Sequence, residues 1–162
     1  MTDGHTDDGD LDAVVSAVLT GSRLLVSIAA RSLGSVDEAV TLPQFRMLVV
    51  LAGRDEAKLV TLAETLDVNP STAMRMADRL AGANLIVRAT NPGNRRESLI
   101  RLTPGGRRIV DEVTARRSAE IEKIVSRLTR DQMQALVTAM AAFNEAGGEP
   151  PVAAHPLGWP SH

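Results

Sequence analysis

The chain has 162 residues, which allows one core of ordinary size and leaves little room for a second independent domain. Apolar residues make up 44% of it and aromatic residues only 2%, so the core must consist of Leu, Val, Ile, Ala and Met. These residue types favour helices and argue against an all-β sandwich. The absence of cysteine excludes disulfides, thiolate metal sites and cysteine nucleophiles.

The net charge of −2 is unevenly distributed along the chain. Five aspartates precede the first arginine: Asp3, Asp7, Asp8, Asp10 and Asp12. Residues 69–108 contain only Asp78 and Glu97 as acids but eight arginines, a local net charge of +6: Arg75, Arg79, Arg88, Arg95, Arg96, Arg101, Arg107 and Arg108. Local positive charge attracts phosphate whatever the total charge, although a solvated basic surface with nothing bound has the same composition.

Both ends of the chain have the composition of tails. Residues 1–10 are acidic and expected to be disordered, and residues 148–162 are rich in Pro and Gly. Whether the C-terminal tail packs on a partner subunit through Trp159 stays open. The acidic start does not resemble a signal peptide and no uncharged apolar stretch reaches 18 residues, so we expect a soluble cytoplasmic protein with no membrane association.

Two helices are predicted in the first third of the chain. From residue 11 to 33 apolar residues recur at spacings of three and four, the pattern of an amphipathic helix, and Gly34 ends it. A second helix is predicted over residues 42–52 because Pro43 suits a first helical turn. The side chains expected to point inward in this second helix are Phe45, Leu48 and Leu51.

Two further helices, joined by a short turn, are predicted next. Thr61 and Glu64 have the spacing of a capping box, which would begin the first of them. Residues 67–68 would form the turn. Asn69 followed by Pro70 is a cap residue followed by proline at the first helical position, and the helix after it should end near Gly82.

A β-hairpin is predicted after these helices. Apolar and polar residues alternate in residues 85–90 and again in residues 98–102, and the sequence Asn-Pro-Gly-Asn at 91–94 is typical of a turn. Arg95 and Arg96 would then lie close to the tip of the hairpin.

Two helices complete the chain. Thr103 and Pro104 begin a long charged helix, and a second capping box, Thr129 with Gln132, begins a last helix that Gly147 ends. The predicted inward side chains are Ile109, Val110, Val113, Ile121, Ile124, Val125 and Leu128 in the long helix, and Met133, Leu136, Val137, Met140 and Phe143 in the last one.

The helix after Asn69 has two unlike faces. At 100° per residue its apolar positions Ala73, Ala77 and Leu80 fall on one arc, and the opposite arc holds Ser71, Thr72, Arg75, Asp78 and Arg79. Ser and Thr can donate to base edges or phosphates, and Arg can bind O6 and N7 of guanine in a major groove. Arginines on the following hairpin could reach phosphates or a narrow minor groove, so the two features together favour DNA binding over a merely solvated face.

Three segments of the sequence resemble the MarR family of transcriptional regulators. Residues 62–85, LAETLDVNPSTAMRMADRLAGANL, resemble its helix-turn-helix, and residues 94–106, NRRESLIRLTPGG, resemble its wing signature, D-x-R-x5-L-T-x-x-G. Residues 41–52 resemble its second helix. The resemblance spans residues 11–145 and implies a mainly α winged helix-turn-helix with a small β-hairpin wing.

The same resemblance implies how the chain is organised. A single domain would cover residues 11–147, with residues 35–103 forming the winged helix-turn-helix region that binds DNA. The helices at 11–34 and 104–147 would form a dimerisation region, in which they interlock with those of a partner in a triangular homodimer.

The family also implies roles for individual residues. Ser71, Thr72 and Arg75 would read the major groove of duplex DNA, Arg96 would enter the minor groove, and Arg95 would contact phosphate. Asn94 departs from the family pattern, which usually has Asp there, and an amide cannot pair ionically with an arginine. The whole predicted DNA-binding set is Asn69, Ser71, Thr72, Arg75, Arg79, Arg88, Asn94, Arg95 and Arg96.

The function expected on these grounds is that of a sequence-specific transcriptional regulator, a repressor that binds pseudo-palindromic operators. The alternative is a winged-helix interaction or dimerisation module without DNA binding, against which the arginines at 75, 95 and 96 argue. An enzyme is not expected, since His5, His155 and His162 all lie in the tails, and neither a cofactor nor a metal site is predicted. MarR relatives often release DNA when a small anionic or aromatic effector binds, but the sequence does not identify such a ligand.

Overall fold

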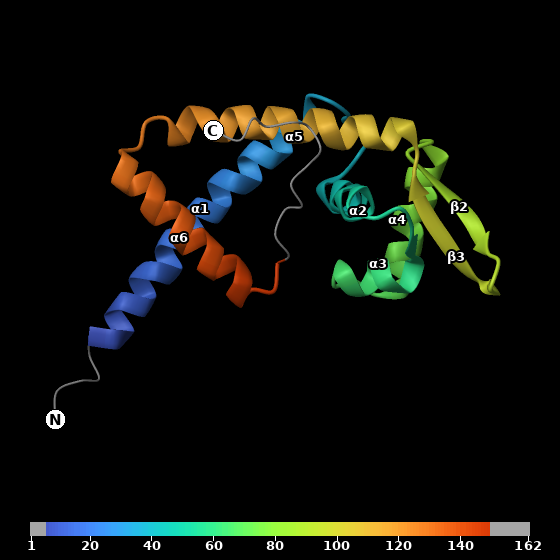
Figure 1. Cartoon of the computed structure of the whole chain (residues 1–162), viewed down its shortest axis with the longest axis horizontal. Helices are drawn as coiled ribbons and strands as arrows, with labels where there is room; N and C mark the ends of the chain where they lie inside the picture. Colours follow the sequence, from blue (N-terminus) through green and yellow to red (C-terminus); the bar gives the residue numbers. More distant parts are fainter. Residues whose placement is uncertain (1–5, 150–162) are drawn as a thin grey trace. The chain divides into compact units, whose positions relative to one another are not determined.

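The computed structural model describes residues 6–149, without the side chains of residues 6–8, 95 and 96. Helices predominate, and a three-stranded antiparallel sheet of order β1-β3-β2 lies beside three of them, α2, α3 and α4 (Figure 1). This confirms the predicted fold class. The elements are α1 (Thr6–Gly34), α2 (Leu42–Ala52), β1 (Ala57–Lys58), α3 (Leu59–Thr65), α4 (Pro70–Gly82), β2 (Ile86–Asn91), β3 (Asn94–Leu102), α5 (Pro104–Val125) and α6 (Arg130–Ala146).

The chain divides into two compact units, with the boundary at Ala119 and Glu120 inside α5. The first unit contains α1 to α4, the sheet and most of α5, and the second contains the end of α5 together with α6. The core lies in the first unit, where α2, α3, α4, the sheet and the start of α5 bury apolar side chains against one another. Its fully buried large side chains include Met47, Leu48, Leu51, Leu62, Leu80, Ile100 and Val113.

The predicted inward faces of α2 and α4 are confirmed, because Phe45, Leu48 and Leu51 are buried, as are Ala73, Ala77 and Leu80. In α5 and α6, most of the side chains that the sequence predicted to point inward are not buried within the chain. In α5 only Val110 and Val113 of the predicted set are buried, and α6 has no buried residue. The apolar side chains of α6 that remain exposed within the chain are Met133, Leu136, Val137, Met140 and Phe143.

The first helix begins earlier than the sequence predicted. It starts at Thr6, so the predicted disordered tail is wrong for residues 6–10. Acidic residues that mark a polar tail by composition also stabilise a helix N-terminus, because their charge opposes the positive end of the helix dipole. Residues 1–5 and 150–162, the rest of the predicted tails, lie outside the described residues.

Most of α1 is both apolar and exposed. Over Gly9–Gly34 the helix is long and apolar enough to cross a membrane, judged by length and composition alone, and 6% of its most apolar window is buried. The buried part is at its C-terminal end, where Ile28 and Leu33 are 1% and 3% exposed. The rest of the helix presents an apolar face that the first unit does not cover.

The start of α3 also differs from the sequence-based prediction. This helix follows directly from β1, with Lys58 as its N-cap, so the predicted capping box of Thr61 and Glu64 is wrong. Thr61 lies inside the helix, and its carbonyl accepts a hydrogen bond from the Thr65 hydroxyl at 2.8 Å. Strand β1 has only two residues, which is too short to show an alternating pattern in the sequence.

The turn between α3 and α4 lies where the sequence placed it. Asp67 adopts a left-handed conformation (φ 52°), its amide donates to the carbonyl of Glu64, and the amide of Val68 donates to the carbonyl of Ala63. This pair of bonds is a Schellman motif, which satisfies the last carbonyls of a helix.

The predicted capping box at Thr129 and Gln132 is also present, at the start of α6.

The junction between the hairpin and α5 requires glycine. The Thr103 hydroxyl donates to the carbonyl of Asn84 at 2.7 Å and accepts from the amide of Gly106 at 3.0 Å. A Cβ at Gly106 would overlap the carbonyl oxygen of Leu85 and lie 2.9 Å from Cδ2 of Leu102. The spacing L-T-x-x-G therefore brings the end of β3 and the start of α5 against the segment that follows α4.

Replacing Gly106 by Ala should destabilise the protein, because the new methyl group would meet backbone, which cannot move aside as a flexible side chain can. We expect the free energy of unfolding to fall by about 1–3 kcal/mol, the usual cost of an overpacked core. Gly105→Ala is the matched control, since a Cβ there would meet nothing closer than 3.5 Å. Urea denaturation followed by circular dichroism measures both variants, and an equal loss in the two would contradict the close packing at Gly106.

Candidate nucleic-acid interface

The N-terminus of α4 is organised by Asn69. Its Oδ1 accepts hydrogen bonds from the amide of Thr72 at 2.8 Å and from the hydroxyl of Ser71 at 2.7 Å. One turn further on, Nη2 of Arg75 donates to the hydroxyl of Thr72 at 3.1 Å. The four polar residues that the sequence assigned to the start of this helix are thus connected by side-chain and backbone hydrogen bonds, which hold the arginine over the first turn.

The two faces of α4 are those the sequence predicted. Ala73, Met76, Ala77 and Leu80 are buried in the core. Ser71, Arg75, Asp78 and Arg79 are exposed, and Thr72 is half-buried. The helix therefore offers a polar, hydrogen-bonding surface that the core supports from behind.

Arg88 of β2 contacts the same helix. Its guanidinium forms an ion pair with the carboxylate of Asp78, and Nη2 also donates to the Met74 sulfur at 3.0 Å. These contacts connect the hairpin to the exposed face of α4. A contact of Arg88 with DNA stays a prediction, and the structure adds a second role that the sequence did not indicate.

The tip of the hairpin has an irregular register. Thr90 pairs with Ser98, but the next residue of β2, Asn91, pairs with Asn94, so β3 advances by four residues where β2 advances by one. The backbone of Arg95 and Arg96 lies in this irregular stretch. The Oδ1 of Asn91 accepts from the amide of Gly93 at 2.9 Å, which closes the turn.

Glu97 connects the turn to β1. Its Oε2 lies 2.9 Å from Nζ of Lys58 and accepts from Nδ2 of Asn91 at 2.8 Å. The hydrogen bond from Lys58 lowers the pKa of Glu97 below its usual value, helped by hydrogen bonds from Asn91 and Asn94 and only partly opposed by desolvation. Sequence reasoning placed Asn91 in the turn and counted Glu97 among the acids, but it missed the connection of both with Lys58; the available signal was an acid directly after two arginines.

Other arginines of the basic segment are engaged within the protein. Arg101 forms an ion pair with Glu56, and Nη1 of Arg107 donates to the carbonyl of Ala52 at 2.9 Å. Arg75 and Arg79 remain on the exposed face of α4. The local charge counted from the sequence is therefore divided between internal contacts and the surface.

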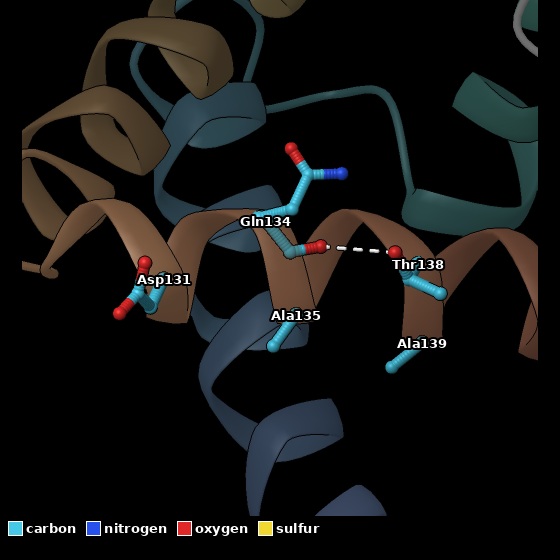
Figure 2. A pocket seen from close by; sticks show the side chains of 5 residues that line it. All are labelled: Asp131, Gln134, Ala135, Thr138 and Ala139. Carbon is cyan, nitrogen blue, oxygen red and sulfur yellow. Dashed lines mark hydrogen bonds between the residues drawn. The ribbon is translucent and has the colours of Figure 1, made fainter.

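A shallow hollow on α6 does not have the features of a ligand site. Figure 2 shows its lining, which comes from a single face of the helix: Asp131, Gln134, Ala135, Thr138 and Ala139. The Thr138 hydroxyl already donates to the Gln134 carbonyl at 3.1 Å (Figure 2). Binding pockets normally enclose a ligand with groups from several elements, and this open helix face does not.

These features define a winged helix-turn-helix protein: α3 and α4 form the helix-turn-helix, and β2 and β3 form the wing. Comparison with known proteins gives the family. The MarR family model matches residues 40–98. The chain is 30% identical to the multiple antibiotic resistance protein MarR of Salmonella typhimurium over 98 residues, which are 60% of this chain and 68% of the relative. The chain belongs to the MarR family.

Two further proteins are similar. The transcriptional repressor MdtR of Bacillus subtilis is 36% identical over 96 residues, 59% of this chain, and the match spans 62% of MdtR, less than two thirds of its length. The crystal structure of RV1404 from Mycobacterium tuberculosis is 48% identical, with a TM-score of 0.81 over 88% of this chain and 97% of that one. Of these proteins, MdtR is named as a transcriptional repressor.

The ion pair between Asp78 and Arg88 should contribute modestly to stability. Because the two side chains are 56% and 27% exposed, a double-mutant cycle of Asp78→Asn and Arg88→Ala should give a coupling of about 0.2–1 kcal/mol in the free energy of unfolding. The control is the cycle of Asp78→Asn with Arg79→Ala, for which we expect a coupling near zero. Urea denaturation of the single and double variants measures both. Equal couplings in the two cycles would show that Arg88 has no specific role on α4.

Proposed function

We propose that this chain is a cytoplasmic, homodimeric transcriptional repressor that binds pseudo-palindromic duplex DNA. The observation that carries the proposal is the exposed polar face of α4, with its connected group of Asn69, Ser71, Thr72 and Arg75. A relative at 36% identity, MdtR, is itself named a transcriptional repressor. Catalysis has no place in the proposal, because MdtR is named as a transcriptional repressor and not as an enzyme.

The start of α4 suits insertion into a major groove. Hydroxyl groups at a helix N-terminus can donate to base edges or phosphates, and an arginine one turn later can bind guanine bidentately. The bond from Arg75 to Thr72 holds the guanidinium close to that end of the helix. Ser71, Thr72 and Arg75 are thus the proposed readers, with Asn69 holding the helix end and Arg79 as a further cation on the same face.

The wing would make the second contact. Arg95 and Arg96 follow the turn at 92–93 and lie in the irregular part of β3. We assign Arg95 to phosphate and Arg96 to the minor groove, where a narrow groove attracts a guanidinium. Asn94, next to the turn of the wing, and Arg88, within β2, complete the proposed contact surface.

The exposed apolar side chains of the outer helices support a homodimer. Leu11, Val14, Val15 and Leu19 of α1 are each about half exposed or more, at 60%, 58%, 48% and 59%. In α6, Val137 and Phe143 are 64% and 54% exposed. Apolar surface of this extent is typical of subunit interfaces, and a two-fold dimer would present two copies of α4 to half-sites about one DNA turn apart. Release by a small anionic or aromatic effector is an additional expectation, for which this chain's residues identify no ligand.

Substitutions of Arg75 and Arg95 should separate base reading from phosphate binding. Arg75→Ala should cost about 1–3 kcal/mol on the preferred operator and much less on random duplex, because a base contact is lost. Arg95→Ala should weaken both duplexes equally and reduce the salt slope by about one unit. Arg96→Ala should fall between the two.

Selection of bound sites from random duplexes identifies the operator, and fluorescence anisotropy at several salt concentrations then measures the variants. If Arg75→Ala lowers both affinities equally while Arg95→Ala removes sequence preference, the two roles are reversed. If the wild-type protein binds no duplex even at low salt, the alternative of an interaction module without DNA binding is correct.

The dimer can be tested on α6. Val137→Lys should weaken the dimer by about tenfold or more, because it removes the burial of one valine and places a charge at the interface. Val60→Lys is the matched control, since Val60 is 53% exposed on α3, outside the proposed dimerisation helices. Light scattering across micromolar concentrations measures the mass. A monomeric wild-type protein, or equal effects of the two lysines, would contradict the assignment.

A further inference from the structure

An acidic side chain lies in the part of the chain that is proposed to contact DNA. Glu97 directly follows Arg95 and Arg96, and its side chain is 34% exposed. A carboxylate near phosphates opposes binding, so by charge alone Glu97 should lower the affinity of the wing for DNA. Its contacts indicate a different role.

Glu97 joins two separate parts of the unit. One oxygen, Oε2, holds both Nζ of Lys58 at 2.9 Å and Nδ2 of Asn91 at 2.8 Å. Asn91 and Asn94 flank the two-residue turn of the wing, while Lys58 belongs to β1. The carboxylate therefore links the tip of the wing to the strand on the other side of β3.

This link lies where the strand ladder is interrupted. The regular pairing of β2 with β3 runs from Ile86 with Leu102 to Thr90 with Ser98, and then the register shifts. Regular pairing holds two strands through backbone hydrogen bonds, and a register shift locally removes that constraint. The bond from Asn91 to Glu97 crosses from β2 to β3 at this position, so a side chain supplies the connection that the ladder does not.

The link also reaches the helix-turn-helix. Lys58 pairs with Leu99 across β1 and β3, which puts Glu97, two residues from Leu99, in a diagonal position on the same face. Lys58 is at the same time the N-cap residue of α3. The turn of the wing is thus connected, through one carboxylate, to the residue that begins the first helix of the helix-turn-helix.

We infer that Glu97 is a positioning residue for DNA binding: its carboxylate fixes the turn of the wing, and with it the arginines at 95 and 96, relative to the helix-turn-helix. The inference rests on the proposed function. It has a distinctive consequence. By its charge alone Glu97 would lower the affinity for duplex DNA, whereas as a positioning residue it raises that affinity.

The test compares Glu97→Ala with Glu56→Ala. Both remove one carboxylate that pairs with a cation of the sheet, and Glu56, which directly precedes β1, pairs with Arg101 rather than with the wing turn. We expect Glu97→Ala to bind the selected operator about fivefold more weakly, the effect of losing hydrogen bonds to one charged group, and Glu56→Ala to change affinity by less than about twofold. Tighter binding by Glu97→Ala, as charge alone predicts, would overturn the inference.

Hydrogen–deuterium exchange of the free proteins supplies a readout that does not need DNA. Amides of residues 90–98 should exchange faster in Glu97→Ala than in the wild type, with exchange in α2 and α4 unchanged, whereas Glu56→Ala should leave the wing tip as it was. Unchanged exchange at the wing tip in Glu97→Ala would overturn the inference. If the wild-type protein binds no duplex, the proposed function fails, and the exchange experiment still decides whether Glu97 holds the wing.

Discussion

The contact of Gly106 with the carbonyl of Leu85 is the constraint on which the DNA-binding region depends. At this point the segment after α4, the end of the hairpin and the start of α5 come together, and the hydroxyl of Thr103 bonds to two of the three. A side chain at Gly106 would separate α5 from the backbone that leaves α4. The close approach of the start of α5 and the end of the wing to the segment after α4 therefore depends on a backbone contact that only glycine permits.

The arginines of the basic segment serve both the fold and the proposed DNA contact. Arg88 and Arg101 pair with carboxylates, and Arg107 donates to a carbonyl of α2. Arg75, in contrast, bonds to the neighbouring hydroxyl of Thr72 within the described part of the chain and stays exposed. Two acids in this region also stabilise contacts between elements: Asp78 joins α4 to β2, and Glu97 joins β3 to β1. A protein that contacts phosphate can thus carry acids close to its binding surface when they hold the cationic side chains in place.

The outer helices explain why a small chain has so many exposed apolar residues. The core of the first unit contains α2, α3, α4, the sheet and the start of α5, whereas most of α1 is exposed and α6 has no buried residue. A helix with an apolar face needs a surface to bury it against. In the proposed dimer, a second subunit provides that surface. A long apolar helix that packs against a partner subunit also meets the length and hydropathy criteria for crossing a membrane, as α1 does.

The sequence by itself determined the features that depend on neighbouring residues. The caps at Asn69 and Thr129, the turn at residues 67–68, the hairpin and the two faces of α4 all follow from local spacing, and the structure has them where they were predicted. Only the tertiary structure decided the strand β1, the start of α3 and the network around Glu97. These depend on pairing between residues far apart in the chain, such as Lys58 with Leu99, and a two-residue strand or a single acid has no periodicity by which local sequence could reveal its partner.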